Sequence, residues 1–119
     1  MKAPMATALC PLHIEQANSW HQRLLGLMFR RTLRPGHGML LTPCTSIHTA
    51  FMRFEIDVVY LDAEFRVLSV HTPLKPWRLS WGAVGTRHAL ELPAGTAQAM
   101  GWQTGQPIGP LLMCTAYGM

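Results

Sequence analysis

The chain has little charge, few cysteines and no long apolar run, and each of these shortages excludes a class of protein. Charged residues make up only 13% of the 119 residues and hydrophobic residues 49%, which excludes a disordered or highly solvated chain. No apolar run approaches the roughly 20 residues that a membrane-spanning helix needs, so we expect no membrane partner. The length suits one domain, residues 1–119, that folds without disulfide or metal staples.

The three cysteines, Cys10, Cys44 and Cys114, stand far apart with no Cys-x-x-Cys spacing. This spacing excludes a zinc ribbon and a thioredoxin-type redox motif. Cys44 and His48 would point to the same side of an extended strand about 13 Å apart, which is too far to chelate one ion unless the chain turns between them. We therefore expect reduced thiols, no metal site and no cofactor.

The amino terminus does not have the pattern of an export signal. It carries one lysine, and Pro4 and Pro11 interrupt the stretch where a signal peptide needs an apolar core of about 7 to 15 residues. The prediction is a cytoplasmic protein.

The net charge of +4 comes from ten basic and six acidic residues. Much of the excess is contributed by Arg23, Arg30, Arg31 and Arg34. Such a patch could attract phosphates, but arginines on the exposed side and end of a helix are typical of a solvated face. No RNA-binding aromatic motif or zinc-finger spacing is present, so we expect no nucleic-acid partner.

One helix is predicted in the N-terminal half, at about residues 19–30. Ser19 and Gln22 have the spacing of a capping box, and leucines follow at helical intervals. Segments with β-type patterns are 6–14, 39–42, 46–52, 56–61, 65–71, 87–92 and 110–116. These patterns predict a mainly β fold, a compact β-sandwich or jelly-roll-like barrel of short strands, with 56–71 as the best hairpin candidate.

Asp57 is a carboxylate inside a run that is apolar on both strand faces. A buried carboxylate pairs, accepts several hydrogen bonds or becomes protonated, because an isolated buried charge is costly. Arg53 can pair with it only if the chain turns between them. Otherwise its partner is His48, a helix arginine or backbone amides. We favour a structural role for Asp57 over a catalytic one.

The segment 72–85 is predicted to be one long loop with two prolines, two glycines, Trp77 and Trp81. We expect it to fold back over the sheets. Its tryptophans then either seal the core or form one wall of a pocket.

Five motifs occur in order, and they are Gly26–Arg30, Gly38–Met39, Ser46–Asp62, Leu74–Arg78 and Leu90–Gly95. Together they resemble the domain-of-unknown-function 192 family over about residues 6–110. The resemblance implies a compact β-sandwich or jelly-roll-like domain with a single notable helix, and no established reaction, cofactor or partner. Relatives usually carry a glycine after the hairpin aspartate, whereas the turn from Asp62 to Phe65 has none.

The leading functional prediction is a noncatalytic accessory or binding domain with a shallow pocket for a small ligand or a peptide segment. The predicted lining residues are His48, Met52, Arg53, Asp57, Trp77 and Trp81. No catalytic residue is assigned in this prediction, and no serine lies in a Gly-x-Ser-x-Gly elbow.

Two alternatives stay open. One is a small hydrolase that uses Asp57 with His48 as an acid–base pair. The other is a structural partner that docks through an exposed β edge. A concave polar pocket would favour the pocket and hydrolase predictions, and an exposed apolar edge would favour docking.

Overall fold

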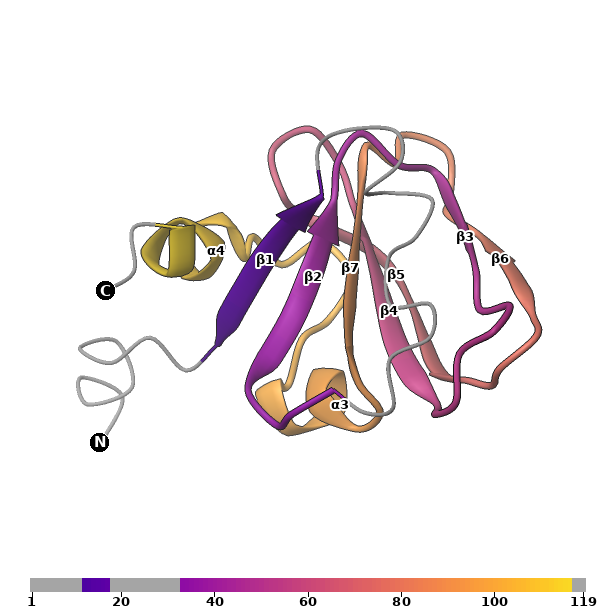
Figure 1. Cartoon of the computed structure of the whole chain (residues 1–119). Helices are drawn as coiled ribbons and strands as arrows, with labels where there is room; N and C mark the ends of the chain where they lie inside the picture. The colour runs from indigo at the N-terminus through magenta and orange to yellow at the C-terminus, as the bar shows by residue number, and fades with distance from the viewer. Residues whose placement is uncertain (1–11, 18–32, 117–119) are drawn as a thin grey trace.

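The computed structural model (Figure 1) describes residues 12–17 and 33–116, and these residues form seven strands in two sheets. The larger sheet has the order β1 (His13–Ala17), β2 (His37–Leu41), β7 (His88–Pro93), β4 (Ile56–Leu61) and β5 (Val67–Leu74). The smaller sheet pairs β3 (Ser46–His48) with β6 (Leu79–Trp81). The mainly β prediction is confirmed, and the sandwich or jelly-roll detail stays a prediction.

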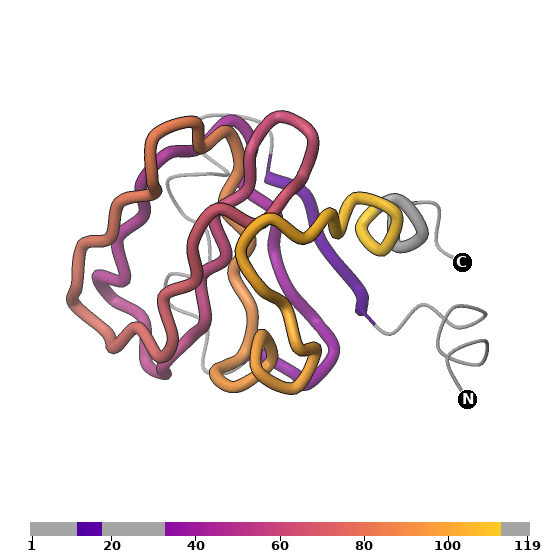
Figure 2. The backbone as a smooth tube through the Cα atoms, turned by 180° about the vertical axis from the view of Figure 1, so that it is seen from behind, coloured from indigo at the N-terminus to yellow at the C-terminus, as the bar shows by residue number. Residues whose placement is uncertain are grey.

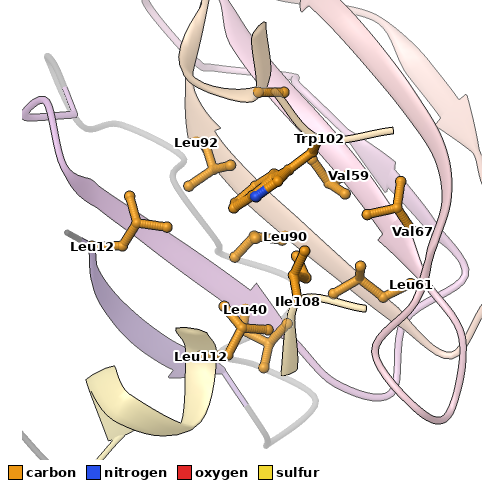
Figure 3. Close-up of a cluster of buried hydrophobic side chains, with 11 residues drawn as sticks. Leu12, Leu40, Val59, Leu61, Val67, Leu90, Leu92, Trp102, Ile108 and Leu112 are labelled. Atoms are coloured by element: carbon orange, nitrogen blue, oxygen red, sulfur yellow. The ribbon is translucent and has the colours of Figure 1, made fainter. Parts of the chain in front are cut away.

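The central strand β4 is buried on both faces, as its apolar sequence predicts. On one face, Val59 and Leu61 join a cluster with Leu90 of β7 and Trp102, which Figure 3 shows. The other face of the sheet packs into a second cluster. Its members include Ile56, Val58 and Tyr60 of β4 and Met39 and Leu41 of β2. The large sheet therefore lies between two apolar clusters.

Gly38 in β2 allows a close approach to β7. A Cβ atom at this position would lie 2.6 Å from Leu92 Cδ2 and 2.8 Å from the Glu91 carbonyl oxygen. Both distances are too short for a real Cβ contact, so the packing of these two strands requires glycine.

The predicted hairpin is present, with β4 and β5 antiparallel. Asp62 organises its turn, because Asp62 Oδ1 accepts the backbone N–H groups of Glu64 and Arg66, both at 2.9 Å. Phe65 has a φ of 63°, in the left-handed region where glycine is favoured. Its ring stacks on His88 with the ring centroids 4.3 Å apart. The aspartate side chain thus forms the turn without a glycine.

Several predicted elements are wrong or displaced. The segment 110–116, expected as a strand, lies in helix α4 (Gly109–Ala116). Its apolar run suits either structure, and a proline near the start of a helix is well tolerated because the first N–H groups have no partner there. Helix α3 (Thr96–Met100) was not predicted. No helix in the described ranges is long and apolar enough to cross a membrane.

The prediction of one long loop at 72–85 is also wrong. Strand β5 continues to Leu74, and β6 lies within the segment expected as a loop. The strand expected at 46–52 is shortened to β3, and the one expected at 87–92 is β7. The helix expected at 19–30 falls outside the described residues, as do residues 6–11 of the first expected strand.

Candidate functional site

The exposed large apolar side chains of the described residues gather on one part of the molecule. They are Phe51, Trp77, Leu79, Trp81 and Val84, with exposed fractions of 47, 61, 66, 64 and 101%. All lie in or beside the two-stranded sheet, and we call residues 44–53 and 75–87 the arm. Figures 1 and 2 place β3 and β6 at the end of the molecule opposite α4. A gathered set of exposed apolar side chains is typical of a binding surface.

The arm has a buried face and an exposed face because side chains alternate along a strand. The paired residues are Ser46 with Trp81, Ile47 with Ser80 and His48 with Leu79. The middle pair is buried, so it points toward the core. The pairs on either side share the outer face, where Leu79 and Trp81 are the largest side chains.

The outer edge of β6 offers backbone groups to a further strand. The bonds at the two ends of the β3–β6 ladder run from Thr49 N to Arg78 O and from Gly82 N to Thr45 O, both 2.9 Å. Hydrogen-bonded pairs alternate in an antiparallel ladder, so the N–H and C=O groups of Leu79 and Trp81 point away from β3. Within the described part of the chain β6 has no other strand beside it.

Thr49 fixes the turn that leads into β6. Its buried hydroxyl donates to Lys75 O at 2.6 Å and accepts from Arg78 N at 2.8 Å. The Thr49 carbonyl accepts the N–H of Trp77 at 3.0 Å. Trp77 and Phe51 have φ values of 62° and 65°, and their rings are in contact with centroids 4.7 Å apart. The hydrogen bonds of Thr49 thus hold the turn at Trp77, whose φ is one that non-glycine residues seldom adopt.

Ser80 attaches the inner face of the arm to the large sheet. Its Oγ lies 2.8 Å from the hydroxyl of Tyr60, which donates, and 2.7 Å from Nδ1 of His71. Burial raises the pKa of Tyr60 from its ordinary value to about 12, so Tyr60 stays protonated and can donate. A serine beside a histidine can form a nucleophile and base. Ser80 is buried, however, so this contact serves to anchor β6.

Asp57 has no exposed surface, and its partners are backbone amides. Asp57 Oδ2 accepts the N–H of Gly95 at 3.1 Å and that of Ala97 at 2.9 Å, at the amino end of α3. The amino end of a helix attracts negatively charged acceptors, because its first N–H groups have no partner within the helix. The predicted burial and hydrogen bonding of Asp57 are confirmed, and amides were one of the partners left open.

Of the six predicted site residues, five belong to the arm and Asp57 belongs to β4. Arg53, Trp77 and Trp81 are exposed, and His48 is half-buried opposite Leu79. Met52 and Asp57 are buried and present no surface to a ligand. The two tryptophans do not seal the core, because most of each ring is exposed.

The hydrolase pair is not assembled in this conformation. The carboxylate of Asp57 bonds α3, while Nδ1 of His48 accepts the N–H of Ala50 at 3.2 Å. Cys44 Sγ donates to the carbonyl of Ser46 at 3.0 Å. Among the described residues there is no group of three histidine, cysteine, aspartate or glutamate side chains that could hold a metal ion.

Phe51, Leu79 and Val84 are part of the exposed group, although the sequence did not single them out. Leu79, Ser80 and Trp81 do alternate between exposed and buried, but three residues are too few to establish a strand period.

A family model, DUF192 (Uncharacterized ACR), matches residues 4–109. The chain belongs to this family of uncharacterised proteins, as its motifs suggested. It is 37% identical over 98 residues to a UPF0127 protein of Pyrococcus horikoshii, with 77% of this chain and 82% of that protein covered. A UPF0127 protein of Pyrococcus abyssi is 31% identical over 101 residues, with 80% and 83% covered.

The fold is shared with a crystal structure of a protein of unknown function from Novosphingobium aromaticivorans. The TM-score is 0.75 at 22% sequence identity, and the match covers 81% of this chain and 73% of the other. This similarity shows a common fold alone.

Proposed function

We propose that this protein is a noncatalytic binding domain whose arm receives an extended segment of another protein. The observation that supports this best is the combination on β6 of an open strand edge with the exposed side chains of Leu79 and Trp81. Strand addition uses the backbone of an edge for affinity and the alternate side chains beside it for specificity.

The edge of β6 is short, with three residues, but it lacks two other protections that natural sheets use at their edges. These are prolines and charged residues within the edge strand. Leu79 and Trp81, whose backbone groups face outward, are neither charged nor proline. A partner strand would bury part of both side chains and would also supply hydrogen bonds to both backbones, so the two contributions reinforce each other.

This proposal modifies the pocket predicted from the sequence. His48, Arg53, Trp77 and Trp81 become parts of a surface around an extended peptide, and Asp57 and Met52 support the fold beneath it. The hydrolase alternative gains no support, because Asp57 and His48 bond different parts of the backbone.

A pair of substitutions at one position tests strand addition. Peptides of 12 residues would be selected from a random phage-displayed library on the wild-type protein, and their binding measured by tryptophan fluorescence. Leu79→Ala removes the leucine side chain but keeps the outward backbone N–H. Leu79→Pro removes the leucine side chain and also this N–H, and it leaves the hydrogen bonds between β6 and β3 intact. We expect Leu79→Ala to bind the peptides more weakly than wild type does. Leu79→Pro should bind about tenfold more weakly than Leu79→Ala, because one backbone hydrogen bond to the peptide is lost.

Gln103→Ala, at an exposed position outside the arm, is the matched control and should bind as wild type does. Equal binding by wild type, Leu79→Ala and Leu79→Pro would contradict the proposal, as would a selection that enriches no peptide. A thermal melt of each variant confirms that it is folded before binding is compared.

A further inference from the structure

The charges of the protein are distributed unevenly with respect to the arm. Its two segments, 44–53 and 75–87, contain none of the six acidic residues of the chain. They contain four of the ten basic residues, and these are Arg53, Lys75, Arg78 and Arg87. All four are exposed. The arm therefore carries four positively charged side chains and no negatively charged one.

The basic residues lie at both ends of β6. Arg78 directly precedes the strand, and Lys75 is tied to the same end because Thr49 contacts the backbone of both. Arg87 lies near the other end, since its carbonyl accepts the N–H of Cys44 at 2.8 Å, two residues before β3. A segment laid along β6 would pass from one set of cations to the other.

We propose that the segment bound by β6 is acidic, with apolar side chains at two alternate positions and aspartate or glutamate on both sides of them. This inference rests on the proposed function and specifies its partner. The two apolar residues lie beside Leu79 and Trp81 on the outer face. The flanking carboxylates face Lys75 and Arg78 at one end and Arg87 at the other. Complementary charge at the ends fixes the register and excludes basic segments.

An anionic lipid surface would also attract cations beside tryptophans, but the strand edge argues for a peptide. Insertion of β6 into lipid would bury the outward N–H and C=O groups of Leu79 and Trp81 without hydrogen-bond partners. A peptide strand satisfies these groups.

Three capped seven-residue peptides test the inference. They share a central Val-Thr-Val and carry two Glu, two Gln or two Lys residues on each side. Binding is followed by tryptophan fluorescence of the whole protein at ionic strengths of about 0.01 M and about 0.15 M. We expect the Glu peptide to bind about tenfold more tightly than the Gln peptide at low salt, with a smaller ratio at high salt and the weakest binding for the Lys peptide.

Arg78→Gln should reduce the preference for the Glu peptide over the Gln peptide. Arg66→Gln, at an exposed position outside the arm, is the matched control and should keep the full preference. Equal affinity of the Glu and Gln peptides would overturn this inference and leave the proposed function intact. No binding of any of the three peptides at up to about 1 mM would instead count against the proposed function.

Vesicles of phosphatidylserine and phosphatidylcholine provide the last comparison. We expect that the Glu peptide does not compete with the vesicles for binding to the protein. Vesicle binding that the Glu peptide displaces, and that Arg78→Gln weakens, would replace the acidic segment by a membrane and overturn the inference.

Discussion

Asp57 links two elements that are distant in sequence. It belongs to β4, and its carboxylate holds two N–H groups at the start of α3, about forty residues later in the chain. Its other oxygen, Oδ1, is buried and accepts no hydrogen bond in the described part of the chain. One oxygen therefore accounts for the bonds that Asp57 makes to α3.

Removal of this oxygen should destabilise the fold. We expect Asp57→Ala to lower the free energy of unfolding by about 2 to 4 kcal/mol, because two buried N–H groups lose their acceptor. Asp57→Asn keeps an accepting oxygen and should cost less than half as much. Urea denaturation measures both values. An unchanged midpoint for Asp57→Ala would show that α3 does not need this acceptor.

The burial of Asp57 could be predicted from the residues around it, but its partners could not. The apolar run on both faces of β4 is local in sequence, whereas Gly95 and Ala97 meet Asp57 only through the pairing of β4 with β7. For the tryptophans, the sequence did not show whether the side chains are buried or exposed. Their size favoured a place against the core, and only the register of β6 with β3 shows that Trp81 points outward.

At the scale of elements, the arm depends on Thr49 for the turn between β5 and β6. Substitution Thr49→Val keeps the shape of the side chain and removes the hydroxyl, which leaves the N–H of Arg78 and the carbonyl of Lys75 without this partner. We expect a loss of about 1 to 3 kcal/mol and faster hydrogen exchange at Trp77 and Arg78, with exchange in β4 less affected.

Thr49→Ser retains the hydroxyl and is the control for this experiment. Its exchange rates at Trp77 and Arg78 should stay close to those of the wild type. If Thr49→Val also behaved as wild type does, the turn would be held by other contacts.

Elements with long, regular patterns were predictable, and short ones were not. The hairpin of β4 and β5 has an alternating or fully apolar pattern over enough residues to be recognised. β6 has three residues, between a proline-rich turn and Gly82, so the sequence resembles a loop. The apolar stretch of α4 fits a buried strand as well as a helix, and Pro110 was the available signal for a helix start.

At the scale of the whole molecule, His88 makes stability depend on pH. It stacks on Phe65 of the β4–β5 turn, and its Nδ1 lies 2.6 Å from Thr42 Oγ1. Burial and then the charge of Arg87 lower the pKa of His88 below its ordinary value. The folded state therefore favours the neutral ring, and the unfolded state binds a proton more readily.

The sign of the effect follows from this difference. The contribution of His88 is fully present above the unfolded pKa of about 6.5 and is lost as pH falls through the lowered pKa of the folded protein. We expect the free energy of unfolding to fall more steeply in wild type than in His88→Gln between about pH 7.5 and 5. Parallel curves for the two proteins in urea would show that His88 does not contribute.

The fold class and the family were accessible from the sequence because they depend on many residues at once. The binding surface was not, because it depends on which face of a three-residue strand is exposed. The cytoplasmic location stays a prediction.

The two faces of the β3–β6 sheet differ in how freely they could change during evolution. Ile47 and Ser80 are committed to the core, since replacing either disturbs packing or the contact with Tyr60. Ser46, His48, Leu79 and Trp81 face outward, so substitutions there should leave folding largely intact. Relatives could therefore keep one scaffold and acquire new binding partners through a handful of surface substitutions.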